Sequence, residues 1–96
     1  MQASNDAIDA WVRKAEEDFT LAHLALVQHP PLIYGATFHA QQCTEKYLKA
    51  VLLSRSQTPP RIHDLVALAD MCRSAGVTMS VDDDQLSILN QFAAQV

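Results

Sequence analysis

The order of apolar and polar residues predicts one helix, over residues 34–54, around which the rest of the chain is arranged. A stripe of mostly small residues follows one of its sides, and a second apolar set lies on the opposite side. A helix that is apolar on two sides must be covered on two sides, so we expect this helix to be central. The stripe consists of Ala36, Ala40, Cys43, Tyr47 and Ala50, and the second set of Phe38, Leu48 and Leu52.

Polar residues interrupt the second apolar set, because Gln41 and Glu45 fall in the same row. Polar groups in a buried row need partners. One interpretation is a solvated edge, in which Glu45 and Lys49 form a surface pair worth ~0.3–0.5 kcal/mol. The other is an accessible polar groove where amides and lysines meet a phosphate-bearing ligand or a partner protein. The candidate ligand-binding residues are Gln41, Gln42, Glu45, Lys46, Lys49 and His63, the last of which could instead cap or pack against a helix start.

Two further helices are predicted on either side of this one. The first extends from about Asp6 to about Gln28, with good N-cap residues at its start, and the pair Pro30-Pro31 follows it. The third begins around His63 and ends at Gly76, a typical stop residue. The apolar seam of the first helix is Ile8, Val12, Ala15, Phe19, Ala22 and Leu26, at alternating steps of four and three residues.

A fourth helix is predicted after Ser80, which with Asp83 resembles a capping box. Its apolar pattern continues to Val96 without a stop signal, so we expect the natural protein to continue further. The apolar segment 32–34, between the first two helices, is expected to pack down on the end of the bundle. The whole indicates a single all-α domain over residues 1–96, an antiparallel up-and-down bundle of four helices.

Composition narrows the classes of function. The net charge is −4, which does not favour broad attachment to nucleic acid, and with only two glycines a Gly-rich phosphate loop is excluded. We find no secretion signal and no membrane-spanning run, so we expect a cytoplasmic protein whose two cysteines, Cys43 and Cys72, are reduced core thiols. His39 and Cys43 are spaced so that both side chains could bind the same metal ion on one face of a helix. Too few other potential ligands cluster near them, so we expect no metal and no cofactor.

Three motifs together resemble a known family. The sequence W-x-x-K-A-E-x-D occupies residues 11–18, F-H-A-Q-Q-x-x-E-K-x-L-K-A occupies residues 38–50, and P-x-x-H-D-L occupies residues 60–65. This pattern is similar to that of HEPN domains, named for higher-eukaryote and prokaryote nucleotide binding. The resemblance covers nearly the whole chain.

The resemblance implies an up-and-down bundle of four to five helices that forms a homodimer. It also implies a non-catalytic subunit that binds a minimal nucleotidyltransferase, and with it a nucleotide or its substrate, in a two-gene toxin–antitoxin-like system. Other members of the family are metal-independent ribonucleases that carry an Arg, then about four to six residues, then a His. No Arg–His pair of this chain has that spacing, so a ribonuclease using His63 with Arg61 or Arg55 is the alternative, beside a plain helical dimerisation module.

Overall fold

The described part of the chain, residues 5–92 of a computed structural model, is all-helical, as predicted. The first three helices begin and end within about two residues of the predicted positions, and the fourth begins within about two residues of its predicted start. The prediction that the last helix continues without a stop is wrong for the described residues, because the helix ends at Asn90 and residues 91–92 form a turn; residues 93–96 lie outside the described part. The helices are α1 (Asn5–Leu26), α2 (Ile33–Ser54), α3 (Leu65–Ser74) and α4 (Asp83–Asn90).

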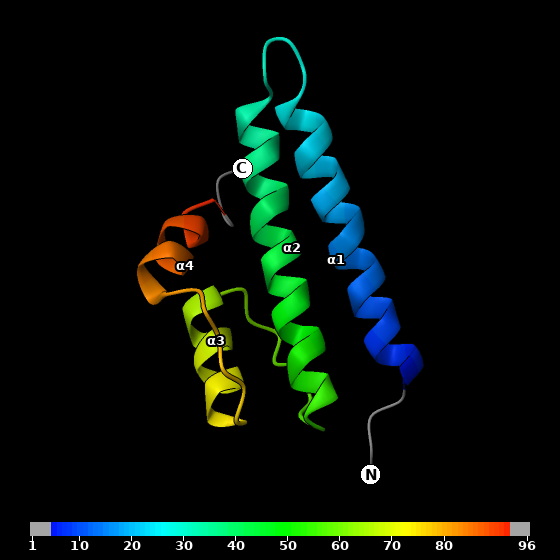
Figure 1. The fold of residues 1–96 in the computed structure, drawn as a ribbon, viewed down its shortest axis with the longest axis vertical. Coiled ribbons are helices and arrows are strands. Elements are labelled where there is room, and N and C mark those ends of the chain that lie inside the picture. Colours follow the sequence, from blue (N-terminus) through cyan, green and yellow to red (C-terminus); the bar gives the residue numbers. More distant parts are fainter. Residues whose placement is uncertain (1–4, 93–96) are drawn as a thin grey trace.

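Helix α2 lies in the middle of the molecule, as its two apolar sides predict. Figure 1 shows α1 antiparallel to α2 along one side, with α3 and α4 on the other. Within the described residues, α1 packs against α2 and against neither of the two short helices. The architecture is therefore a long α1–α2 hairpin with α3 and α4 packed on one side of its second helix.

Local capping explains where α3 begins and ends. The Asp64 carboxylate accepts hydrogen bonds from the N–H groups of Val66 and Ala67, at 3.0 and 3.3 Å, so Asp64 is the N-cap of α3. Gly76 follows the helix with a φ of +90°, in the left-handed region that favours glycine, as the predicted stop requires.

The start of α4 differs from the prediction. The capping box is formed by Asp82 and Gln85, not by Ser80 and Asp83. The Asp82 carboxylate accepts the Gln85 N–H at 2.8 Å, and the Gln85 side-chain oxygen accepts the Asp82 N–H at 3.2 Å. Glutamine is the usual partner in such a box because its side chain is long enough to reach back to the N-cap, whereas aspartate is shorter.

The core lies between α2, α3 and α4. It contains Leu48 and Leu52 of the second apolar set of α2, together with apolar residues of α3 and one residue of α4. Both cysteines are free and buried, as predicted, and burial raises the pKa of each thiol. The buried core cluster is Leu48, Leu52, Leu65, Leu68, Ala69, Cys72 and Leu86.

The far half of the hairpin, by contrast, is largely uncovered. The segment 32–34 was expected to pack down on the bundle, and this is wrong: its three side chains are exposed, and α2 already begins at Ile33. The seam of α1 is buried at Ala15, but Phe19 is 65% and Leu26 54% exposed. The physical reason is length, because α3 and α4 are short helices that cover only part of α2 (Figure 1).

Candidate functional site

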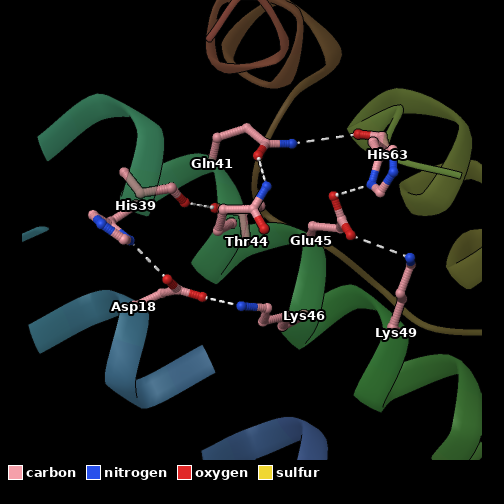
Figure 2. A network of polar contacts seen from close by, with 10 residues as sticks. Asp18, His39, Gln41, Thr44, Glu45, Lys46, Lys49 and His63 are labelled. Carbon is pink, nitrogen blue, oxygen red and sulfur yellow. Dashed lines mark hydrogen bonds and ion pairs between the residues drawn. The ribbon is translucent and has the colours of Figure 1, made fainter. Parts of the chain in front are cut away.

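The polar row of α2 forms an internal ion network centred on Glu45. Glu45 is only 4% exposed, and its two carboxylate oxygens have different partners. One oxygen accepts a hydrogen bond from the Lys49 ammonium at 3.2 Å, and the other lies 3.0 Å from Nδ1 of His63. Figure 2 shows the carboxylate between these two groups. The pairing joins α2 to the segment that leads into α3.

Lys49 depends on this network because it is itself only 5% exposed. Its ammonium also lies 5.7 Å from the centroid of the Trp11 ring of α1, within the range of a cation–π interaction. A buried charge is tolerated only when it is paired and hydrogen-bonded. The Glu45–Lys49 pair therefore links α1, α2 and the start of α3. A substitution of either residue is expected to change the stability of the fold, whether or not a ligand binds nearby.

Two amides complete this side of α2. Gln41 is fully buried, its NH₂ group donates to the backbone carbonyl of His63 at 3.4 Å, and its oxygen accepts from Gln42 at 2.7 Å. Among residues 5–92, no buried side-chain nitrogen or oxygen lacks a hydrogen-bond partner. The expectation that polar groups in this row need partners is thus confirmed, and the partners are supplied by the protein itself.

A second buried carboxylate, Asp18 of α1, occupies the opposite side of α2. One of its oxygens lies 2.8 Å from Nδ1 of His39, and the other accepts from the Lys46 ammonium (Figure 2). Asp18 is the last residue of the first family motif, but it is not among the predicted site residues. The available signal was its position, because it falls between Ala15 and Ala22 of the apolar seam at steps of three and four residues.

The six predicted ligand-binding residues therefore do not line one groove. Gln41, Glu45 and Lys49 are buried, and Lys46 faces α1 instead. The expectation of an accessible polar strip is wrong for these positions, because α3 and Trp11 cover them. Only the sixth residue, His63, has a largely exposed side chain, at 71%. Their role in binding a ligand stays a prediction.

The alternative catalytic residues are all at the surface. Arg55, Arg61 and His63 are exposed, and in the described part of the chain neither guanidinium forms an ion pair. Glu45 holds the Nδ1 side of the His63 ring, which leaves Nε2 directed away from the pair. A carboxylate–imidazole pair of this kind suits a general base.

Metal and membrane sites gain no support from the geometry. Across residues 5–92, His, Cys, Asp and Glu side chains form no group of three that could hold a metal ion. His39 turns to Asp18, while Cys43 packs in the interior with a pKa raised by burial and by the charge of Asp18. None of the described helices combines the length and hydropathy needed to cross a bilayer.

Apolar hollows flank the uncovered half of the hairpin. One, of about 550 Å³, opens between α1, α2 and the end of α4, and another, of about 310 Å³, lies on the opposite flank. Both are lined mainly by apolar side chains. The first hollow is lined by Phe19, Ala22, His23, Leu26, Ala36, Thr37, Ala40, Cys43, Thr44 and Leu89, and the second by Leu21, Leu24, Ala25, Gln28, Leu32, Gly35 and His39.

Comparison with known proteins gives one match. The sequence model of one family, described as the HEPN domain, matches residues 8–96, which is nearly the whole chain. No curated protein and no solved structure matches the chain.

Proposed function

The chain belongs to the HEPN domain family, and we propose that within this family it acts as a non-catalytic binding subunit. The observation that supports this most directly is the uncovered half of the hairpin. Residues 19–44 contain no Asp, Glu, Lys or Arg, and most exposed large apolar side chains of the described chain lie in residues 19–34. Apolar patches of this kind are typical of protein–protein interaction sites.

The partner we propose is a minimal nucleotidyltransferase, in a two-gene toxin–antitoxin-like system, with the HEPN chain itself a homodimer. These elements come from what the family resemblance implies. The polar row of α2 supports a binding role over a catalytic one, since its charged groups already satisfy one another. A nucleotide or RNA would then meet the exposed edge of the row, at His63, with the half-buried Gln42 on the same side of α2.

Co-expression with the nucleotidyltransferase encoded by a neighbouring gene tests the proposal. The affinity-tagged HEPN chain should capture that enzyme. Leu24→Glu, on the flank of the smaller hollow, should weaken capture at least about tenfold, because it places a charge in a desolvated contact. The exposed Glu17→Gln variant is the control and should bind like wild type. A chain that folds but never captures the nucleotidyltransferase would refute the proposal.

A second candidate function, metal-independent RNA cleavage, is favoured by one observation, the Glu45–His63 pair. Such cleavage needs a base for the 2′-hydroxyl and a cation for the developing phosphorane charge. Here His63 would supply the base and Arg61 or Arg55 the cation. Purified chain should be incubated with total RNA in chelator. Cleavage that is lost in His63→Ala and in Arg61→Ala, but kept in the exposed control His29→Ala, would favour the enzyme.

A further inference from the structure

The smaller apolar hollow, of about 310 Å³, has a histidine in its lining. It lies between α1 and α2, and among the described residues that line it His39 alone has a titratable side chain. We call this space the His39 hollow. The two helices meet here at Ala25 and Gly35, which are too small to fill the space. The remaining lining residues are Leu21, Leu24, Gln28 and Leu32.

The imidazole of His39 is held on one side by a buried carboxylate. Its Nδ1 lies 2.8 Å from one oxygen of Asp18, which is 6% exposed, and the other oxygen accepts from the Lys46 ammonium. The Phe38 ring supports the imidazole edge-on, with the ring centroids 5.3 Å apart. Because Lys46 already balances the carboxylate, a neutral imidazole completes a cluster without net charge.

In a neutral ring, the hydrogen bond to a carboxylate keeps the proton on Nδ1. The other nitrogen, Nε2, is then left as a hydrogen-bond acceptor, and Figure 2 shows it turned away from Asp18. Gln28, the other polar residue of the lining, is exposed, and its NH₂ group already donates to the Leu24 carbonyl at 3.0 Å. A group that enters the His39 hollow therefore meets one fixed acceptor and is otherwise surrounded by hydrocarbon.

We infer that the His39 hollow receives the phenol side chain of a tyrosine from the nucleotidyltransferase, an assignment that rests on the proposed function and names the chemistry of the contact. A phenol combines an apolar ring with one hydroxyl donor. Its hydroxyl would donate to Nε2 of His39 while the ring packs against the leucines. A volume of about 310 Å³ is at the lower end of the range of about 300–1,000 Å³ for ligand sites, which suits a single ring. Tyrosine is also enriched among the residues that dominate interface energies.

The single acceptor selects this side chain over other occupants. A phenylalanine or leucine would cover Nε2 of His39 without offering a donor, and a buried acceptor left unsatisfied costs free energy. A carboxylate or ammonium group would lose its hydration in an apolar hollow. A site built to hydrogen-bond a hydroxyl therefore rejects the analogue that lacks it.

Two amino-acid amides test the hollow on the HEPN chain alone. The isotope-labelled chain is titrated with N-acetyltyrosine amide and, as the matched probe without the hydroxyl, with N-acetylphenylalanine amide. Nuclear magnetic resonance follows the His39 ring nitrogens and the backbone signals of the lining residues. The tyrosine amide should bind with a Kd about tenfold lower than the phenylalanine amide, and it alone should shift the Nε2 signal of His39.

Three histidine variants locate the preference. His39→Leu removes the acceptor and should bring the two Kd values within about twofold of each other. His39→Gln can donate to Asp18 and still offer an oxygen acceptor, so the tyrosine amide should stay preferred. His23→Leu makes the same change at the histidine of the larger hollow and should keep the wild-type preference. The comparison on wild type requires no variant, so it decides the question if His39→Leu does not fold.

The partner provides a second, independent measurement. Each exposed tyrosine of the captured nucleotidyltransferase is replaced by phenylalanine. One replacement should weaken capture by the wild-type chain about tenfold, but capture by His39→Leu no more than about twofold, because the lost hydroxyl then has no acceptor to lose.

Several results would overturn the assignment. Equal Kd values for the two amides on wild type would do so, as would an unchanged preference in His39→Leu, or capture that no tyrosine replacement weakens. If the tyrosine amide binds as expected but no nucleotidyltransferase is captured, the binding-subunit proposal fails and the phenol site stands. If the enzyme is captured but the two amides bind equally, the phenol site fails and the binding-subunit proposal stands.

Discussion

Glu45→Gln is the substitution that examines the buried ion network most sharply. It preserves the size and shape of the side chain but removes the negative charge between Lys49 and His63. Lys49, at 5% exposure, is left as a buried cation without a counter-ion. His63 is disturbed much less, because most of its side chain is in water.

The size of the effect follows from this burial. Removing one member of a buried ion pair costs about 3–5 kcal/mol. Two features reduce that cost: the new amide oxygen can still accept from the ammonium, and the Trp11 ring, 5.7 Å away, keeps a cation–π contact worth roughly 0.5–2 kcal/mol. We therefore expect a loss of about 2–3 kcal/mol in the free energy of unfolding. For a domain of this size that corresponds to about 10–20 °C in Tm.

The double variant Glu45→Gln/Lys49→Met separates pairing from simple loss of contacts. It leaves neither charge in the interior, so it should cost clearly less than the sum of the two single variants. Urea unfolding, followed by far-UV circular dichroism and by fluorescence of Trp11, measures each free energy. The exposed Glu17→Gln variant should stay within about 0.5 kcal/mol of wild type. Single variants within about 1 kcal/mol of wild type, or strictly additive losses, would refute the network.

Three further predictions concern caps and thiols. Hydrogen bonds from Asn90, then from backbone N–H groups, hold the pKa of Asp64 below its usual value, so the stability that this carboxylate adds is present above about pH 4 and is lost as pH falls through its folded pKa. Asn90→Ala should therefore lower the free energy of unfolding, measured in urea, by about 1 kcal/mol at pH 7 and by less in acid. A loss that does not depend on pH would contradict this. Gly76→Ala should destabilise the protein by about 1 kcal/mol, because Gly76 has a φ of +90°. Gly35→Ala should stabilise it slightly, because Gly35 is helical and the added methyl group meets only an ordinary contact. Thermal melts that show equal effects of the two variants would contradict this difference in backbone conformation. Since burial raises the pKa of both cysteine thiols, a thiol reagent should modify them much more slowly in native than in urea-unfolded protein, and equal rates would contradict their burial.

Much of the fold could be predicted from the sequence because its signals are local. Apolar periodicity identified α2 as the helix covered on two sides, and Gly76 marked the end of α3. The start of α4 was missed because Ser80 and Asp82 are both good N-cap residues, and only the reach of Gln85 decides between them. Such choices between near-equal caps depend on geometry that periodicity does not contain.

The candidate site was less predictable, because burial depends on neighbours from other helices. The pattern indicated that Gln41 and Glu45 need partners, yet it did not show that Trp11 and the start of α3 cover the row. Lys46 follows Glu45 directly, and one residue turns a helix by about 100°, which takes its side chain to the α1 side. There it meets Asp18, whose position in the apolar seam was the only sequence signal of a buried carboxylate.

The uncovered half of the hairpin could not be predicted from the sequence for a related reason. The seam of α1 predicts an apolar face, but not whether anything covers it. That depends on the lengths of the other helices, and α3 with 10 residues and α4 with 8 are much shorter than α2 with 22. The exposed seam is thus a property of the whole arrangement rather than of any one segment.

Hydrogen–deuterium exchange of the HEPN chain, alone and with the neighbouring nucleotidyltransferase, tests most directly whether the uncharged hairpin half or the polar row binds the partner. We expect the partner to slow exchange within residues 19–40 and to leave the segment around His63 nearly unchanged. Slowed exchange confined to residues 55–65, with the hairpin half unaffected, would contradict it.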